Sequence, residues 1–139
     1  MAKKDIYSDL SPKVSIKPQF INSNTTVTGT GVDLQGFEGA LVVITAGTIA
    51  GSSSANVYTP EVQESNSSDT GFTAVADADL VGTEAAAVHN GGTDSTCLKI
   101  GYTGTKRYIR VVLTTTAFTT AGGYIGADII KGAPHVGAV

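Results

Sequence analysis

The sequence has few of the residues that stabilise small proteins by covalent or metal cross-links. Its 139 residues include one cysteine, one methionine and no tryptophan. A single cysteine, Cys97, excludes an internal disulfide and a zinc site built from several cysteines. No apolar run approaches about 18 residues, which excludes a membrane-spanning helix. The start, Met-Ala-Lys-Lys-Asp, has no apolar segment behind its lysines, so we expect no secretory signal.

The residues that are abundant favour β-structure. Threonine (19), serine (11) and glycine (17) make up about a third of the chain. Threonine, valine and isoleucine suit strands because their branched Cβ packs on a pleated surface and loses rotamer freedom in a helix. Clusters of glycine and serine at intervals indicate turns between short strands. We therefore predict an all-β protein, an antiparallel β-sandwich or a jelly-roll-like barrel with an extended N-terminal arm.

Alternation of apolar and polar residues places the strands. The predicted strands are 25–34, 41–44, 57–64, 72–75, 96–102, 107–115 and 124–130. The run Leu41–Ile44 is apolar throughout, which predicts a strand covered on both faces. Pro60 lacks a donor and predicts a sheet edge. Segment 77–89 fits a helical turn or a small-residue strand equally well.

The chain divides into three parts by composition. Residues 1–24 contain two prolines and read as an extended arm, in which one short edge strand is possible. Residues 25–131 form a single β-rich domain, and residues 132–139 form a tail. Ordering an arm residue costs about 1–2 kcal/mol, so we expect the arm to be mobile unless a neighbour covers its apolar side chains. We also expect the chain to fold without residues 1–20.

Charges are segregated along the sequence. Between Lys17 and Lys99 there is no lysine or arginine, and this interval holds nine of the twelve acidic residues. Both ends carry a net positive charge. This pattern suggests contacts between copies or with a partner, although a solvated surface with clustered charges is an equally good interpretation.

Short motifs offer weak support for an enzyme or a metal site. Asp69-Thr-Gly71 matches the catalytic triplet of aspartic proteases, but it follows a polar turn and not an apolar strand. His89 and His135 have no strong ligand at helical spacing, and Asp77 and Asp79 lack a full calcium-ligand set. Glycine pairs at 29–31 and 101–104 lack the elements of a phosphate loop. We therefore expect no catalytic, cofactor-binding or metal-binding residues.

A basic cluster opens the strand at 107–115. Lys106, Arg107 and Arg110 surround a tyrosine, which is suitable chemistry for nucleic acid. Three charges on an acidic chain are few for phosphate binding, so we expect ion pairing with Glu61, Glu64 or Asp79 instead.

Several stretches resemble small structural proteins of tailed bacteriophages. They are Tyr58–Ser65, Phe72–Gly82, Ile100–Val112 and Gly132–His135, and the similarity spans about residues 30–135. This family is encoded near the major capsid protein and includes capsid decoration, or cement, proteins. The resemblance implies a β-rich virion protein without enzymatic activity.

We therefore expect a protein that is made in the bacterial cytoplasm, binds the outer capsid surface and stabilises the shell. The alternative is a tail or head–tail connector component. The expected partners are the major capsid protein and further copies of the chain, most simply as a trimer, with no nucleic acid and no membrane. The predicted contact residues are Ile6, Tyr7, Leu10, Val14, Ile16, Lys106, Arg107 and Arg110.

Overall fold

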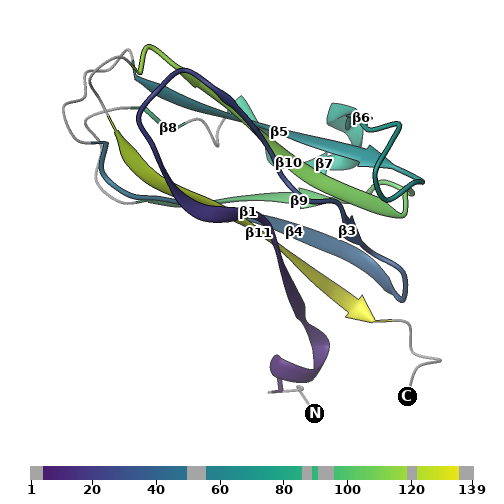
Figure 1. The fold of residues 1–139 in the computed structure, drawn as a ribbon. Helices are drawn as coiled ribbons and strands as arrows, with labels where there is room; N and C mark the ends of the chain where they lie inside the picture. The colour runs from purple at the N-terminus through teal and green to yellow at the C-terminus, as the bar shows by residue number, and fades with distance from the viewer. Residues whose placement is uncertain (1–4, 50–55, 86–88, 91–95, 119–121, 135–139) are drawn as a thin grey trace.

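The structure, a computed structural model, describes residues 5–49, 56–85, 89–90, 96–118 and 122–134. These residues form two antiparallel β-sheets packed against each other, a β-sandwich (Figure 1). The all-β prediction is confirmed, in its sandwich form. No helix in the described ranges is long and apolar enough to span a membrane.

The first sheet contains five strands. Their order is β1 (Ser11–Ile21), β11 (Gly123–Pro134), β4 (Phe37–Ala46), β9 (Thr96–Tyr102) and β7 (Leu80–Val81). β11 and β4 are long and lie side by side, because their alternating residues bury one face of each strand against the second sheet. Ile125, Ala127 and Ile129 share the buried face of β11, as the alternation predicted.

The second sheet is built around two long central strands. Its main path is β2 (Thr26–Thr28), β10 (Tyr108–Thr116), β5 (Val57–Ser65) and β6 (Thr73–Ala74), with β3 (Val32–Asp33) also paired to β10 and β8 (His89–Asn90) to β5. The strand predicted at 25–34 is thus two short strands on one edge of β10, interrupted between them. The strand predicted at 107–115 is confirmed as β10, with Ile109, Val111 and Leu113 buried.

The core lies between the two sheets. The largest fully buried side chains come from β4, β5, β9, β10, β11 and the segment after β4: Tyr58, Ile44, Ile49, Ile100, Ile109, Leu113, Ile129, Val42, Val62 and Val111. The rings of Tyr58 and Phe118 pack in a tilted arrangement, with centroids 5.0 Å apart and planes at 52°. Aliphatic residues that alternate along each strand thus supply the hydrophobic stabilisation of the sandwich.

Two polar side chains connect the sheets on opposite sides. Ser15 on β1 accepts a hydrogen bond from the Val111 N–H on β10 at 3.1 Å. On the other side, the hydroxyl of Tyr102 on β9 donates to Glu64 Oε2 on β5 at 2.7 Å. Burial, followed by the hydrogen bond to Glu64, raises the pKa of Tyr102. Because each contact joins strands of different sheets, together they fix how the sheets stack.

The region predicted as an arm contains a strand of the sandwich. β1 pairs with β11 from Ser11 to Ile21, with register shifts on either side of Ile16. Ile16 and Ile21 are only 2% and 5% exposed. Residues 11–21 are therefore part of the first sheet, and removing residues 1–20 would remove core side chains. The expectation that the chain folds without residues 1–20 does not agree with this arrangement.

Two other boundaries differ from the sequence prediction. The region predicted as a tail starts inside β11, because Gly132 pairs with Gly39 and Pro134 with Phe37. Residues 135–139 lie outside the described ranges. The segment predicted at 77–89 starts as a 3-10 turn, η2 (Asp77–Asp79), and continues as β7.

Pro60 lies within β5 and not at the end of the strand. The backbone nitrogens of Pro60 and Val62 both point away from β10. The Val62 N–H instead donates a hydrogen bond to the Glu84 carboxylate at 2.5 Å. A missing donor on that side removes no hydrogen bond to β10, so proline is tolerated. The predicted edge is thus correct locally, although β6 and β8 pair with β5 at its two ends.

Candidate contact surfaces

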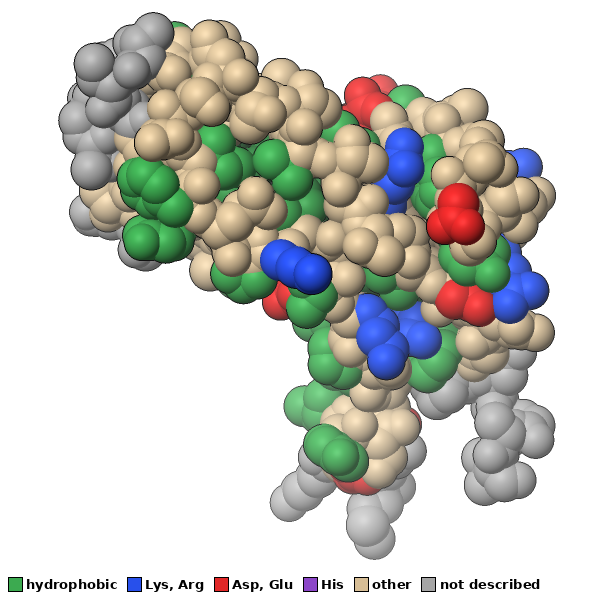
Figure 2. All heavy atoms as spheres, in the orientation of Figure 1, with side chains coloured by type: hydrophobic (Ala, Val, Ile, Leu, Met, Phe, Trp, Pro, Cys, Tyr) green, Lys and Arg blue, Asp and Glu red, His purple; other side chains and the backbone are tan. Residues whose placement is uncertain are grey.

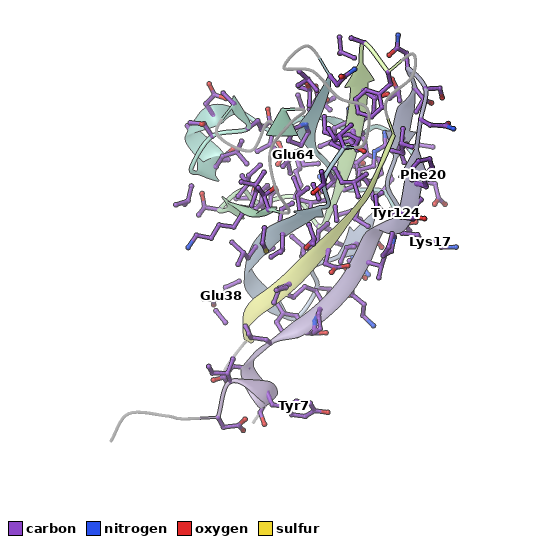
Figure 3. The ribbon with its side chains drawn as sticks, turned by 90° about the vertical axis from the view of Figure 1, so that its left-hand side faces the viewer. Tyr7, Lys17, Phe20, Glu38, Glu64 and Tyr124 are labelled. Carbon is purple, nitrogen blue, oxygen red and sulfur yellow. The ribbon has the colours of Figure 1, made fainter. Side chains whose placement is uncertain are left out.

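The N-terminal projection, residues 5–10, extends away from the body of the sandwich. It contains a 3-10 turn, η1 (Tyr7–Asp9), in which the Ser8 N–H donates to Asp5 Oδ1 at 3.2 Å. Ile6, Tyr7 and Leu10 are 67%, 93% and 41% exposed. Figure 2 shows apolar side chains along this leg, and Figure 3 places Tyr7 at its far end. The projection therefore presents apolar surface at a distance from the core.

The projection is supported from one side by the end of β11. Ser11 pairs with Lys131, and a Cβ at Gly132 would lie 3.2 Å from Leu10 Cδ2. Glycine at this position lets Leu10 lie close to the β11 backbone. The predicted contact residues Ile6, Tyr7 and Leu10 thus lie together, and their other sides remain accessible.

Val14 and Ile16 were predicted as contact residues together with Ile6, Tyr7 and Leu10. In the structure they lie in β1, outside the projection, and only Val14 is exposed. Val14 is 49% exposed and pairs with Asp128 on β11. Ile16 belongs to the core, so it is unavailable to a partner while β1 stays in its sheet. The two positions differ because the register of β1 shifts between them.

Arg107 forms an ion pair that the sequence prediction missed. Its Nε donates to Asp33 Oδ1 at 3.0 Å and its Nη2 to Asp33 Oδ2 at 2.8 Å. The hydrogen bonds from Arg107 lower the pKa of Asp33 from 3.8 to about 2, against a smaller opposing effect of burial. The predicted acidic partners of the basic cluster were Glu61, Glu64 and Asp79, and the Arg107 partner is instead on β3.

Arg110 is engaged by neighbours on the second sheet. Its Nε and Nη2 donate to Gln63 Oε1 at 2.9 and 2.8 Å, and its guanidinium lies 4.1 Å from the centre of the Phe72 ring. Gln63 in turn donates to Glu61 Oε1 at 2.6 Å. Arg110 therefore reaches one of the predicted acidic residues through an amide, and stacking covers one side of its planar group.

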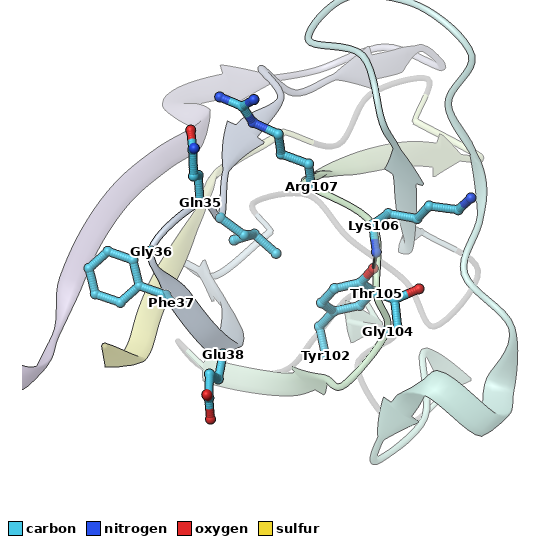
Figure 4. Close-up of a pocket in the computed structure, with 10 residues that line it drawn as sticks. Gln35, Gly36, Phe37, Glu38, Tyr102, Gly104, Thr105, Lys106 and Arg107 are labelled. Atoms are coloured by element: carbon cyan, nitrogen blue, oxygen red, sulfur yellow. Dashed lines mark hydrogen bonds between the residues drawn. The ribbon is translucent and has the colours of Figure 1, made fainter. Parts of the chain in front are cut away.

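A hollow of about 320 Å³ lies beside the basic cluster, between the β3–β4 turn and the β9–β10 loop (Figure 4). Phe37 and Glu38 line one side, and Tyr102 and Gly104 the other. Lys106 extends away from the turn in Figure 4, and Arg107 is bound to Asp33. Within the described lining, the cationic groups thus do not converge on a common point where an anion would bind.

The outer face of the first sheet is a surface that the sequence prediction did not identify. We use this name for the side chains of that sheet that point away from the core: Pro12, Val14, Phe20, Leu41, Val43, Thr45, Val81, Cys97, Lys99, Gly101, Tyr124, Gly126, Asp128 and Ile130. Most of them are apolar. Val81 is 62% exposed, and Leu41, Val43 and Ile130 are partly buried by their neighbours.

An aromatic pair marks one end of this face. Phe20 and Tyr124 are cross-strand partners whose ring centroids lie 5.0 Å apart, and they are 50% and 66% exposed (Figure 3). The sequence signal was present, since Phe20 continues the alternation of β1 and Tyr124 that of β11. It became interpretable only when the register placed the two rings opposite each other.

The outer face of the second sheet has a different character. It carries Thr26, Thr28, Thr59, Glu61, Gln63, Arg110, Thr114 and Thr116, together with Val57, Tyr108 and Val112. Most of these side chains are polar and form hydrogen bonds with one another or face solvent. A polar outer face is the ordinary state of an antiparallel sheet in water, so the first sheet is the unusual one.

The residues of the weak motifs do not form a site in the described chain. Asp69 lies in the exposed turn after β5, where Ser68 Oγ donates to Asp69 Oδ2 at 3.1 Å. No three His, Cys, Asp or Glu side chains in the described ranges lie close enough to hold a metal ion. His89 is in β8, and His135 lies outside these ranges.

Comparisons with known proteins do not assign the chain to a family. The sequence matches no protein-family model and has no significant match among curated proteins. The function is therefore inferred from the surfaces described above and from the short stretches of sequence that resemble phage structural proteins.

Proposed function

We propose that this chain is a structural protein of a tailed-phage particle, a decoration protein that binds the outer surface of the capsid and stabilises the shell. The phage assignment comes from the stretches that resemble such proteins, including Tyr58–Ser65 in β5 and Ile100–Val112, which covers the end of β9 and most of β10. Both stretches lie in strands that build the sandwich, so the similarity concerns the body of the domain.

The observation that carries a binding role is the exposure of the N-terminal projection. Ile6 and Tyr7 are among the most exposed large apolar side chains of the described chain. Burying an aliphatic side chain of this size against a partner contributes about 1.5–3 kcal/mol. This gain offsets the cost of ordering the segment, about 1–2 kcal/mol per residue. A projection of this kind is stabilised by contact with a neighbour.

A capsid provides such a contact in many identical copies. When one oligomer binds several sites at once, the later contacts form at a high effective concentration. Modest contacts from each projection then add up to tight attachment. In this arrangement a small protein braces a shell by linking its subunits.

The test uses particles of the phage whose genome encodes the chain, assembled without it and then mixed with purified protein. Wild type is expected to bind until the particle sites are filled, as measured by quantitative gel analysis of sedimented particles. The variant Ile6→Ser/Tyr7→Ser should bind at least tenfold more weakly, because both apolar contacts are lost. It should unfold at the same urea concentration as wild type, since neither residue is in the core.

A matched control changes residues of similar exposure elsewhere. Ser67→Ala/Ser68→Ala alters the exposed turn after β5 and is expected to bind like wild type. If Ile6→Ser/Tyr7→Ser bound particles as tightly as wild type, the role of the projection in capsid binding would be contradicted. Immunogold labelling of native particles separates the remaining possibilities, because label on the tail or neck would support the connector alternative, and unlabelled particles would refute both.

A further inference from the structure

The outer face of the first sheet contains more apolar side chains than is usual for a sheet face in contact with water. The run Leu41–Ile44 has the composition of a strand covered on both sides, and the sandwich covers only one of them. Val42 and Ile44 are at most 1% exposed, whereas Leu41 and Val43 point outward. Among the described residues, no third sheet lies outside the first one. A cover from another molecule would complete the arrangement that the sequence favours.

The strand register arranges this face in rows across the strands. In one row, Asp128 on β11 and Lys99 on β9 lie on either side of Val43 on β4. In the next row, Ile130 and Gly101 lie on either side of Leu41. Neighbouring strands are about 4.8 Å apart, so each flanking pair is separated by about 10 Å. The opposite charges of Asp128 and Lys99 are thus placed symmetrically about β4. The large Ile130 and the small Gly101 are placed in the same way.

This arrangement is complementary to itself. A two-fold axis parallel to β4, lying over that strand, exchanges the positions of β11 and β9 between two facing copies. Asp128 of one copy then lies over Lys99 of the other, and Ile130 lies over Gly101. A two-fold axis perpendicular to the strands and lying over the row of Val43 would instead place Asp128 over Asp128, which is unfavourable. The charges therefore select one of the two symmetric ways to stack these faces.

We propose that the outer face of the first sheet binds the same face of a second copy of this chain, about a two-fold axis parallel to β4. Sheets that pack face to face keep their strands within about 30° of each other, so the correspondence is closest at the three central strands, β11, β4 and β9. The pair would form two equivalent Asp128–Lys99 contacts around a central apolar strip of Val43 and Leu41.

The area of the face suits a dimer of modest affinity. The three central strands, at about 4.8 Å spacing and with about eight residues each at 3.3 Å, give a face of about 380 Å². Two copies would bury about 760 Å² in total, which is in the range of weak or transient interfaces.

This inference does not depend on the proposed phage function. A surface that is complementary to itself about a two-fold axis builds pairs, and the trimer implied by the resemblance would require a different surface. The N-terminal projection continues β1 beyond one end of the sandwich in Figure 3, where Leu10 lies against Gly132 at the end of this face.

Charge exchange tests the pairing directly. Wild type is expected to sediment with twice its chain mass of 14.1 kDa at about 100 µM. Asp128→Lys and Lys99→Asp should each weaken dimerisation about tenfold or more, because each places like charges at both symmetric contacts. The double variant, which restores opposite charges, should dimerise within about threefold of wild type. Both residues are exposed, so the variants should fold normally.

The control Asp69→Lys makes the same change of charge in the turn after β5, outside the face, and should leave the dimer unchanged. A wild-type chain that remains monomeric at about 100 µM would overturn the proposal. It would equally be overturned by a dimer that tolerates both single reversals, or by a double variant no better than the single ones.

A cross-link locates the axis. Thr45 lies on β4 beneath the proposed axis, so Thr45→Cys in a Cys97→Ser background should be joined to its symmetry mate by a short bifunctional maleimide. Facing sheets are about 10 Å apart, which leaves opposed Cα atoms too far apart for a disulfide but within the reach of such a linker. Thr114→Cys, exposed on the outer face of the second sheet, is the matched control and should stay uncross-linked. Equal cross-linking of the two variants would contradict the assigned face.

Discussion

The Ser15 hydroxyl on β1 accepts a hydrogen bond from the Val111 N–H on β10 at 3.1 Å, and donates to the Thr30 carbonyl at the same distance. Ser15 is only 4% exposed. Its own carbonyl accepts from the Thr30 N–H at 2.8 Å. One residue of the first sheet thus binds two segments of the second, and closes this side of the sandwich.

Removing this hydroxyl should destabilise the fold. Ser15→Ala leaves the buried Val111 N–H without its acceptor, which costs about 1–3 kcal/mol. Urea unfolding measures the change in the free energy of unfolding. Ser67→Ala, in the exposed turn after β5, is expected to stay within about 0.5 kcal/mol of wild type. Equal stability of the two variants would show that Ser15 does not connect the sheets.

Gly29 is required by the close approach of Ser15. A Cβ at position 29 would lie 2.4 Å from Ser15 Oγ and 2.6 Å from the Val111 carbonyl oxygen. Gly29→Ala must therefore displace the backbone of β10 or break the Ser15 hydrogen bonds, and we expect a loss of about 3 kcal/mol or more. Gly39→Ala on β4 is the matched control. A Cβ there meets nothing within 4 Å, and the melting temperature should not fall.

The ion pair of Asp33 with Arg107 predicts an acid-sensitive contribution to stability. The pKa of Asp33 is lowered to about 2, so its carboxylate stabilises the fold fully above about pH 4. That contribution is lost as the pH falls through about 2, where the folded state also takes up the proton. An NMR titration of the Asp33 carboxyl carbon should show this midpoint.

The variant Arg107→Gln should return the pKa of Asp33 toward 3.8 and flatten the pH dependence of unfolding below about pH 4. Lys106→Gln removes the neighbouring cation and should leave the Asp33 midpoint in place. A wild-type midpoint near 3.8 would mean that the bidentate contact is not maintained in solution.

Glu84 completes the outer edge of β5 by accepting the Val62 N–H. Glu84→Ala removes this acceptor and should cost about 1–3 kcal/mol, because Val62 is fully buried. Burial raises the pKa of Glu84 despite the opposing effect of the Val62 hydrogen bond. The protonated form is therefore favoured in the folded state, and stability should decrease as the pH rises through the raised pKa.

Glu84→Gln keeps an acceptor for Val62 without the charge. It should be more stable than Glu84→Ala at every pH and should not show the loss of stability at high pH. Urea unfolding at about pH 4, below the ordinary pKa of a glutamate, and at about pH 8 provides the comparison. A glutamine variant as unstable as the alanine variant would indicate that Val62 has no need of this acceptor.

The strands with strict alternation were predicted well from the sequence. β9 was predicted at 96–102 and found there, and β10 was found within one residue of its predicted start and end. In such strands successive side chains point to opposite faces, so the alternation of apolar and polar residues is enough to predict which residues are buried. Ile6, Tyr7 and Leu10 were predicted as arm residues that a partner would cover, and within the single chain all three are exposed.

The errors concern contacts between distant parts of the chain. Asp33 and Arg107 are 74 positions apart, and no local pattern favours Asp33 over acidic residues that lie nearer in the sequence. Ile16 was predicted to contact a partner because its strand was taken as an arm. Its burial follows from pairing with β11, more than 100 positions later. The order of the strands decides such contacts, and local patterns do not encode that order.

Composition and alternation by themselves determined an all-β domain, its principal strands and the buried face of each. These properties are local, because the geometry of a strand turns every second side chain to the same side. Only the tertiary structure decided that β1 belongs to the sheet, that Arg107 is paired with Asp33, and that one sheet keeps an apolar outer face. Each of these depends on which strands become neighbours, a result of how the whole core packs.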